Sequence, residues 1–327
     1  MILHYEVIHM NMYENKTVLL IGGGGTLGTY TAKELLRLGA RVEILCPEEK
    51  ISDHERLCFH RGLGTKEVLQ SLFDKTHYDG IVNFIHYPKA EDYYDIHPFL
   101  MGNTDHLIFL SSYRVYANEQ HPITESAPRL YDVMNDEDLL NNETYAISKS
   151  KCEDYLRSQH AGENWTIVRP VISFSERRLD LLLYSGREVL DYAARGQTMP
   201  MPSMVRNFTA GVDWAGNSGK LIANLLFKPD AIGETFTVYS GHGLTWGKVA
   251  ELYSELTGVQ IDWCEEEDFL AHIYKYKSDR FYWKYDRRYN RDVDCSKILR
   301  VTGLSANDFK SVKEGIQTEL ARINKGE

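Results

Sequence analysis

Short apolar runs alternate with helix-forming segments along the first half of the chain. Buried strands are predicted at Thr17–Ile21, Arg41–Cys46, Gly80–Ile85, Leu107–Leu110 and Trp165–Val168. Helices are predicted at Tyr30–Leu38, which is followed by Gly39 as a stop signal, and at Tyr145–Gln159. This alternation predicts βαβ units, and therefore an α/β fold with a doubly wound parallel sheet covered by helices on both faces.

Beyond Val171 the alternation becomes less regular. Helices are expected at Arg177–Arg195, Asp213–Leu226 and Thr245–Thr257, a strand at Phe236–Tyr239, and a Pro- and Met-rich loop at Gln197–Ser203. We therefore expect an N-terminal extension over residues 1–15, a Rossmann-type domain over residues 16–172 and a smaller mixed α/β C-terminal lobe over residues 173–327. The chain is expected to cross between the domain and the lobe more than once.

The composition narrows the class of protein. The 327 residues carry a formal net charge of −10 and a pI near 5.7, which argues against a nucleic-acid or anionic-membrane partner but leaves room for a local basic pocket. No apolar run approaches the roughly 18–20 residues of a membrane span, and Met1–Asn15 lacks the features of a secretion signal. We interpret the aromatic and basic stretch Tyr274–Arg291 as part of a ligand site rather than a nucleic-acid surface.

The cysteines and histidines indicate no metal site. The five cysteines are odd in number, and neither a Cys-x-x-Cys nor a His-Glu-x-x-His motif occurs. We therefore expect free thiols in a reducing, cytoplasmic environment, and we predict no metal ligand.

A run of glycines separates the first predicted strand from the first predicted helix. From Gly22 to Gly28 the sequence is Gly-Gly-Gly-Gly-Thr-Leu-Gly. Glycines at such a turn let backbone N–H groups approach a pyrophosphate, and the helix N-terminus adds positive potential. We interpret Gly22, Gly25, Thr26, Leu27 and Gly28 as the phosphate turn of a dinucleotide site.

Two further groups carry candidate chemistry. Tyr145 and Lys149 are four residues apart on a predicted helix, so the ammonium can lie near the phenol and stabilise its ionised form. Ser111 and Ser112 follow the strand Leu107–Leu110, and open α/β sheets bind ligands at the carboxyl ends of their strands. A serine there can hold a substrate oxygen while Tyr145 moves its proton. Taken singly, each group also fits an ordinary structural role.

Together these motifs resemble the extended short-chain dehydrogenase/reductases, above all the NAD-dependent sugar-nucleotide epimerase/dehydratase family. The resemblance continues along the chain in the order in which the family has its motifs. It is carried by Ser111–Tyr116, Pro122–Glu125, Tyr145–Lys149, Val168–Pro170, Arg206–Ala215, Gly233–Val238 and Asp294–Leu304.

The resemblance implies roles for individual residues. Tyr145 is the expected general acid/base, Lys149 supports it and holds the nicotinamide ribose, and Ser112 binds the reacting oxygen. Arg206 and Arg288 are expected at the diphosphate of a nucleotide-sugar substrate, because guanidinium groups form bidentate contacts with phosphate. NAD is the expected cofactor, with NADP left open, and a homodimer is the expected assembly.

Two cofactor positions depart from the family pattern. Cys46 stands where NAD-dependent members have the aspartate that binds the adenosine ribose, and Asn83 begins the segment that replaces the usual His-x-Ala-Ala. Glu48 or Glu49 could replace this aspartate. Lys50 or Arg56 could instead bind the 2′-phosphate of NADP.

A third departure bears on the reaction. Sugar-nucleotide 4,6-dehydratases carry an Asp-Glu pair directly after the catalytic Ser or Thr, because elimination of water needs an additional acid and base. Tyr113 and Arg114 occupy these positions here. We therefore expect an epimerase or a ketoreductase acting on a nucleotide-activated sugar, and the choice between the two stays open. The alternative is a non-catalytic dinucleotide-binding sensor or scaffold, which the altered adenine site favours and the complete catalytic set opposes.

Overall fold

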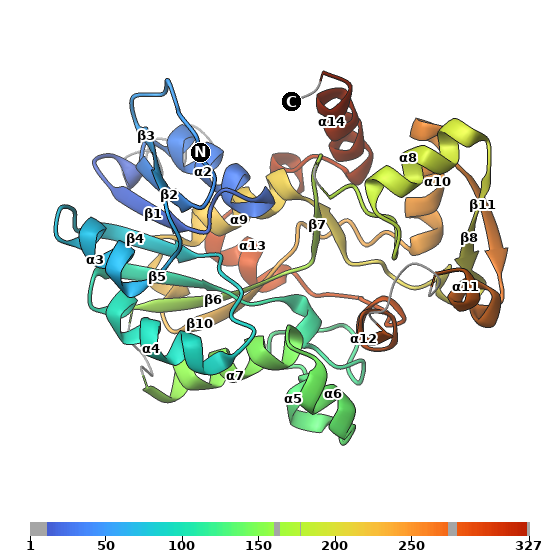
Figure 1. Ribbon diagram of the computed structural model, residues 1–327, viewed down its shortest axis with the longest axis horizontal. Helices are drawn as coiled ribbons and strands as arrows, with labels where there is room; N and C mark the ends of the chain where they lie inside the picture. Colours follow the sequence, from blue (N-terminus) through green and yellow to red (C-terminus); the bar gives the residue numbers. More distant parts are fainter. Residues whose placement is uncertain (1–11, 160–163, 177, 274–279, 326–327) are drawn as a thin grey trace.

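The structure is a computed structural model that describes residues 12–159, 164–176, 178–273 and 280–325. Its centre is a seven-stranded sheet in which all neighbouring strands are parallel (Figure 1). From one edge to the other the strands are β10 (Glu234–Val238), β6 (Trp165–Pro170), β5 (Thr104–Leu110), β4 (Tyr78–Asn83), β1 (Thr17–Ile21), β2 (Arg41–Cys46) and β3 (Leu57–Arg61). The strand order reverses between β1 and β4, which places a crevice at their carboxyl ends. The predicted doubly wound parallel sheet is confirmed.

Helices cover both faces of the sheet. One face packs against α3 (Lys66–Phe73), α4 (Ala90–Met101) and α7 (Ala146–Gln159), and the other against α2 (Thr26–Leu38), α9 (Ala215–Leu225) and α13 (Ser296–Thr302). Successive strand residues alternate between the two apolar clusters: Leu20 packs with α2 and α9, whereas Leu19 packs with α3 and α4. The inner strands are mostly apolar because helices cover both of their faces, whereas the edge strand β3 is partly exposed.

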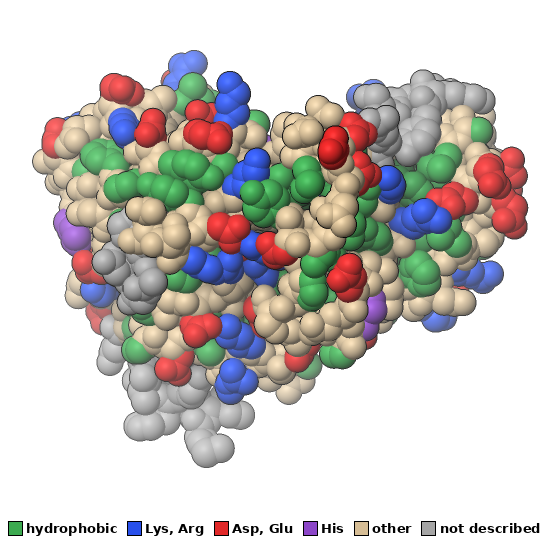
Figure 2. Space-filling view, turned by 90° about the horizontal axis from the view of Figure 1, so that it is seen from below, with side chains coloured by type: hydrophobic (Ala, Val, Ile, Leu, Met, Phe, Trp, Pro, Cys, Tyr) green, Lys and Arg blue, Asp and Glu red, His purple; other side chains and the backbone are tan. Residues whose placement is uncertain are grey.

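The smaller part of the molecule contains two two-stranded parallel sheets. β7 (Ile172–Phe174) pairs with β9 (Val212–Trp214), and β8 (Thr198–Pro202) pairs with β11 (Gln260–Cys264) at the end farthest from the main sheet (Figure 1). Its helices are α8 (Gly186–Arg195), α10 (Trp246–Thr257), α11 (Glu266–Ile273), α12 (Arg280–Tyr282) and α14 (Val312–Lys325). On the face seen in Figure 2, acidic and basic side chains are interspersed over both parts.

Short elements complete the chain. The connection from β5 to α7 contains the 3-10 turn η1 (Tyr113–Val115) and the helices α5 (Leu130–Val133) and α6 (Glu137–Asn142). A π-helical turn, η4 (Trp283–Arg287), follows α12, and three further 3-10 turns are η2 (Ser203–Val205), η3 (Pro229–Ala231) and η5 (Ala306–Asp308). Within the described part of the chain, no helix combines the length and apolar character needed to cross a membrane.

The predicted loop at Gln197–Ser203 is wrong, because this segment forms strand β8. Met199 and Met201 alternate into the core and are fully buried. β8 pairs with β11 alone, and a strand with a single neighbour tolerates prolines that lack an N–H group. The side-chain alternation therefore outweighs the prolines that suggested a loop.

The predicted helix Arg177–Arg195 is too long at its start. The helix observed there, α8, begins at Gly186, and its N-cap Ser185 accepts from the backbone N–H of Glu188. Immediately before it, Leu181 and Tyr184 pair across a tight turn that a helix cannot contain. Residue 177 itself lies outside the described part.

Both ends of the described chain pack on the larger part of the molecule. The buried Tyr13 donates its hydroxyl to the carbonyl oxygen of Ala223 in α9 at 2.8 Å. In α14, the Glu319 carboxylate accepts from the hydroxyl of Tyr30 in α2 and from the indole N–H of Trp214 at 2.6 Å. Segments from beyond residue 172, namely β10, α9 and α13, therefore complete the domain that begins with β1, and α14 of the smaller part contacts it through Tyr30.

A buried ion cluster joins α7 to the central strand β6. The carboxylate of Glu153 accepts from Arg169 at 2.5 and 2.8 Å, and also pairs with Arg129 and Arg157 at 3.3 Å. Burial alone would raise the pKa of Glu153, but the charge and hydrogen bonds of Arg169 lower it to about 2. One carboxylate thus holds the helix against the sheet.

We expect Glu153→Gln to lower the free energy of unfolding at pH 7 by about 3 kcal/mol, because the change leaves buried arginines without a carboxylate. Since the folded-state pKa of Glu153 is depressed, its stabilising contribution is present above pH 4.5 and is lost as the pH falls toward 2. The native chain and the variant should therefore converge in stability in urea unfolding experiments run at decreasing pH.

The matched control is Glu251→Gln. Its carboxylate pairs with Lys248 at 2.7 Å on the surface, so its loss should cost no more than about 0.5 kcal/mol. Equal destabilisation by the two substitutions would contradict a special role for the buried cluster.

Candidate active site

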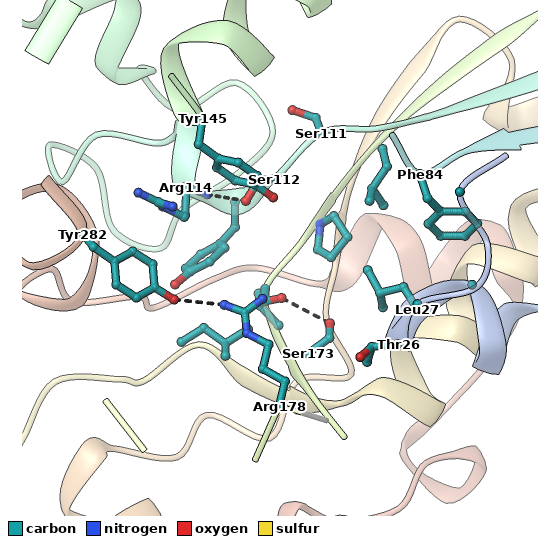
Figure 3. Close-up of a pocket in the computed structure, with 18 of the residues that line it drawn as sticks. Thr26, Leu27, Phe84, Ser111, Ser112, Arg114, Tyr145, Ser173, Arg178 and Tyr282 are labelled. Carbon is teal, nitrogen blue, oxygen red and sulfur yellow. Dashed lines mark hydrogen bonds between the residues drawn. The ribbon is translucent and has the colours of Figure 1, made fainter. Parts of the chain in front are cut away.

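A pocket of about 450 Å³ opens where the carboxyl ends of β1, β4, β5 and β6 meet. Figure 3 shows its two ends, with Thr26, Leu27 and Phe84 on one side and Ser112, Arg114 and Tyr145 on the other. The pocket therefore unites the glycine turn with two motifs that lie far from it in the sequence.

The glycines form the turn between β1 and α2. Gly22 has a φ of 71°, in the left-handed region that favours glycine, and a Cβ on Gly28 would lie 2.3 Å from the carbonyl oxygen of Gly23. Gly25 caps α2 without a side chain, so the N–H groups of the first helical turn remain available to an anion. The pocket is lined by all five residues predicted for this turn: Gly22, Gly25, Thr26, Leu27 and Gly28.

Glu48 lies beside the glycine turn, past the end of β2. A Cβ on Gly24 would come within 3.1 Å of a carboxylate oxygen of Glu48. Lys50 donates from Nζ to the carbonyl oxygen of Gly24 at 2.9 Å. Cys46 is buried and does not line the pocket, and burial raises the pKa of its thiol. The charged groups that reach the turn are therefore those of Glu48 and Lys50.

Three other residues considered for the cofactor have partners elsewhere. Arg56 donates to two carbonyl oxygens at the C-terminal end of α2. Glu49 pairs with Arg61 on the surface at 3.3 Å. Asn83 is fully buried, donates to the hydroxyl of Tyr87 at 3.0 Å, and is not among the described residues that line the pocket.

Ser112 and Tyr145 both line the pocket. Ser112 follows β5, and its hydroxyl oxygen accepts from the backbone N–H of Arg114 at 3.2 Å. Figure 3 shows the hydroxyl groups of Ser112 and Tyr145 directed toward the same region of the pocket. Two hydroxyl groups so placed can act on one substrate oxygen, the first by binding it and the second by exchanging its proton.

Glu143, which sequence reasoning missed, fixes the position of Tyr145. Its buried carboxylate accepts from the backbone N–H groups of Tyr145 at 3.0 Å and Ile147 at 3.1 Å, where α7 begins. The other carboxylate oxygen accepts from Arg114 at 3.2 Å. An acidic residue directly before a helix is the sequence signal that could have identified it, because such residues satisfy the unpaired N–H groups of the first turn.

Lys149 lies behind the pocket wall. Its side chain is 1% exposed, and Nζ donates to the carbonyl oxygens of Ile85 at 3.0 Å and Leu110 at 2.5 Å. Burial lowers the pKa of this ammonium to about 8. Lys149 therefore ties α7 to the ends of β4 and β5, one helical turn after Tyr145.

Arg114 and His86 flank the ring of Tyr145. The Arg114 guanidinium lies 4.9 Å from that ring and 4.6 Å from the ring of Tyr282. The His86 ring lies 4.9 Å from the Tyr145 ring. Burial, together with the charges of Lys149 and Arg114, lowers the pKa of His86 to about 4, so its imidazole is neutral at pH 7.

Asp286 is a buried carboxylate beneath this end of the pocket. It accepts from the hydroxyl of Tyr113 at 2.6 Å and from Arg291 at 3.2 Å, pairs with Arg287, and lies 3.5 Å from Arg114. Burial alone would raise the pKa of Asp286, but the charges of the three arginines lower it. This carboxylate joins the turn after β5 to the C-terminal segment.

Neither arginine predicted to bind a diphosphate lines this pocket. Arg206 packs over the ring of Trp263 at 5.1 Å, and Arg288 pairs with Glu266 at 3.3 Å. The structure therefore does not bring Arg206 and Arg288 to Ser112, and their role at a diphosphate stays a prediction.

Two other arginines that sequence reasoning did not select, Arg178 and Arg287, line the pocket instead. Arg287 is adjacent to the predicted Arg288 and ends the π-helical turn η4. The turn decides which of the two neighbours points inward, and no sequence pattern signals a π-helical turn.

Known proteins share features with this chain. Residues 18–187, just over half of the chain, match the NAD dependent epimerase/dehydratase family. UDP-glucose 4-epimerase 1 from rice, Oryza sativa subsp. japonica, is 25% identical in an alignment of 185 positions that covers 47% of this chain and 49% of the rice protein. The chain thus spans about half the length of that curated relative.

Two solved structures share the fold over nearly the whole chain. The epimerase Mth375 from Methanothermobacter thermautotrophicus is 17% identical, with a TM-score of 0.72 and coverage of 98% of this chain and 95% of that one. The enzyme WbmG from Bordetella bronchiseptica, in complex with NAD and UDP, is 16% identical, with a TM-score of 0.67 and coverage of 94% of each chain. At these identities the likeness concerns the fold alone. Because the family match spans more than half of its length, the chain belongs to the NAD-dependent epimerase/dehydratase family, within the extended short-chain dehydrogenase/reductases.

Proposed function

We propose that the chain transfers hydride between a nicotinamide cofactor and a nucleotide-activated sugar, as an epimerase or a ketoreductase. The proposal is carried by the single pocket that joins the glycine turn to the hydroxyl groups of Ser112 and Tyr145. The rice UDP-glucose 4-epimerase and the WbmG complex with NAD and UDP support a nucleotide-sugar substrate. A sensor or scaffold would have no use for two hydroxyl groups directed at one ligand atom.

The glycine turn fits a dinucleotide, because Gly28 leaves no room for a side chain and the first turn of α2 offers open N–H groups. When bound, the nicotinamide would supply the hydride donor or acceptor. The residues that would hold the pyrophosphate are Gly22, Gly25, Thr26, Leu27 and Gly28. Glu48 would bind the adenosine ribose in place of the aspartate that Cys46 replaces, which favours NAD over NADP.

Tyr145 is the general acid/base in this proposal. Its phenol oxygen takes the proton of the sugar hydroxyl during oxidation and returns a proton to the ketone oxygen during reduction. Ser112 holds the same substrate oxygen by a hydrogen bond. Lys149 fixes the helical turn that carries Tyr145, because its ammonium donates to the carbonyl oxygens of Ile85 and Leu110.

The pocket lining argues against dehydration. Eliminating water requires an additional acid and base, and the described residues that line the pocket include no Asp or Glu. Tyr113 and Arg114 fill the positions of the dehydratase pair, and both are engaged by Asp286. Epimerisation and keto reduction need only Ser112, Tyr145, Lys149 and the cofactor.

The two remaining reactions differ in the fate of the cofactor. An epimerase returns the hydride to the same sugar and keeps its NAD, whereas a ketoreductase exchanges the cofactor at every turnover. Mass spectrometry of the nucleotide released when the purified protein is denatured separates them. Stoichiometric NAD would favour the epimerase, and an empty protein that binds reduced cofactor would favour the ketoreductase.

We expect Tyr145→Phe to lower kcat at least about 100-fold while leaving cofactor binding intact, because it removes the acid/base group and little else. The assay follows the interconversion of nucleotide sugars from a panel that the native protein turns over. Tyr155→Phe is the matched control, since this tyrosine is also on α7 but donates to the backbone oxygen of Tyr94 outside the pocket. Native turnover in Tyr145→Phe would refute the assignment, and cofactor binding without turnover of any sugar by the native chain would favour the sensor.

We expect the stability of the native chain to rise with pH in a way that Lys149→Met abolishes. The pKa of Lys149 is lowered to about 8 in the folded chain from an ordinary 10.5. Between these values the unfolded chain holds a proton that the folded chain has released, so Lys149 contributes about 1 kcal/mol more stability at pH 9 than at pH 7. Urea unfolding at both pH values measures the difference, with Lys151→Met on the same helix as control. An identical pH dependence in native and Lys149→Met proteins would contradict the buried position.

We expect the native chain to bind NAD more tightly than NADP, because the Glu48 carboxylate beside the glycine turn would repel a 2′-phosphate. Glu48→Gln should lower the ratio of the NADP to the NAD dissociation constant about tenfold, which corresponds to about 1.4 kcal/mol. Glu49→Gln is the control, since Glu49 pairs with Arg61 on the surface. Dissociation constants measured by calorimetry test this preference. Tighter binding of NADP by the native chain would mean that Lys50, and not Glu48, determines which cofactor binds at the glycine turn.

A further inference from the structure

Three arginines line the pocket on the side where Ser112 and Tyr145 lie. They are Arg114 from η1, Arg178 from the segment after β7, and Arg287 from η4. Among the described residues that line the pocket there is no carboxylate, so the lining is cationic. The region where a substrate would bind is therefore positively charged, although the whole chain has a formal net charge of −10.

The three guanidinium groups converge on one side chain, Tyr282. Arg178 donates to its hydroxyl at 2.9 Å, and Arg287 also donates to this oxygen while lying 4.3 Å from the ring. Arg114 lies 4.6 Å from the same ring. Figure 3 shows the Tyr282 hydroxyl hydrogen-bonded to Arg178, and the Arg114 guanidinium turned away from the hydroxyl groups of Ser112 and Tyr145. Tyr282 thus fixes the spacing of the cations without neutralising them.

The nearby carboxylates do not cancel this charge. Among the described residues of this region, four arginines pair with three carboxylates. Arg114 pairs with Glu143 and Asp286, Arg178 pairs with Asp180, and Arg287 and Arg291 both pair with Asp286. Lys149 adds a further cation behind the pocket wall. These carboxylates are not among the described residues that line the pocket, so a ligand there would meet the N–H groups that the arginines do not use in these pairs.

Arg114 stands at the reacting end of the pocket. Its guanidinium is held between the rings of Tyr145 and Tyr282, at 4.9 and 4.6 Å, and its side chain is 15% exposed. Arg178 is more open, at 48%. Glu143 accepts from one terminal nitrogen of Arg114 at 3.2 Å, and Asp286 lies 3.5 Å from its Nε. A guanidinium has five N–H donors, so the remaining N–H groups of Arg114 can donate to a further carboxylate.

We propose that the sugar of the substrate carries a carboxylate on the ring carbon adjacent to the reacting carbon. In this proposal Arg114 and Arg178 bind the carboxylate. The proposal rests on the proposed function and names the class of sugar: a nucleotide-activated sugar acid rather than a neutral hexose. The diphosphate of a nucleotide sugar is attached to the first carbon of the ring and is another possible anion for these arginines. The position of Arg114 against Tyr145 favours the carboxylate, because Tyr145 marks the reacting oxygen.

The test compares sugars that differ only in the carboxylate. Binding to the NAD-loaded protein is measured by calorimetry for UDP-glucuronate against UDP-glucose, for GDP-mannuronate against GDP-mannose, and for UDP and GDP alone. We expect at least one acid to bind about tenfold or more tightly than its neutral partner, as befits a hydrogen-bonded charged group. Equal binding of acid and neutral sugar in a pair that binds, or tighter binding of the neutral sugar, would overturn the carboxylate proposal alone. No binding of any nucleotide or sugar would overturn the proposed function itself.

Two variants assign the preference to the arginines. Arg114→Met and Arg178→Gln should each reduce the ratio of acid to neutral binding toward one while the affinity for the nucleotide diphosphate alone is unchanged. Arg178 is half exposed, so its variant retains the fold even where Arg114→Met does not, and urea unfolding checks both. Arg61→Met is the control, because Arg61 pairs with Glu49 on the surface at 3.3 Å and does not line the pocket. Equal loss of affinity for acid, neutral sugar and free diphosphate in both variants would overturn the proposal in favour of the diphosphate.

Discussion

The substrate end of the pocket depends on one buried carboxylate, that of Asp286. It receives the hydroxyl of Tyr113 and the charges of Arg287, Arg291 and Arg114, which come from segments more than 160 residues apart in the chain. Removing a single partner from such a site leaves an unpaired buried charge, so its members are held to one geometry. The turn after β5 and the C-terminal segment are thereby fixed relative to each other, and the pocket between them takes its shape.

The strands and the glycine turn of the cofactor half could be predicted from sequence because their signals are local, whereas Cys46 and Asn83, expected at the cofactor, do not line the pocket. Thr17–Ile21, the glycines up to Gly28 and the spacing of Tyr145 and Lys149 each encode their structure within a few residues. The substrate half could not be predicted in the same way. Whether Arg287 or Arg288 faces the pocket depends on a π-helical turn, and Glu143 acquires its importance only when α7 meets Arg114.

The turn after Ser112 shows how a departure from a family motif changes a site. Where dehydratases carry two acids, Tyr113 and Arg114 contribute a hydrogen-bonded ring and a cation. The same backbone thus supports the opposite charge beside Tyr145. Glu143 and Asp286 keep the arginine in place from the side away from the pocket, so the acids have a supporting function instead of a chemical one.

The return of the chain to the main sheet at β10 has an architectural consequence. Because β10, α9 and α13 come from beyond β7, the smaller part is built from separate excursions: β7 to β9 lie between β6 and β10, and α10 to η4 lie between β10 and α13. A truncation directly after β7 does not release an intact cofactor-binding half, since it removes the edge strand β10 and the helices α9 and α13 that cover one face. Fragments and chimaeras made at the apparent border would expose that face, so the unit that can be exchanged between relatives is the whole fold.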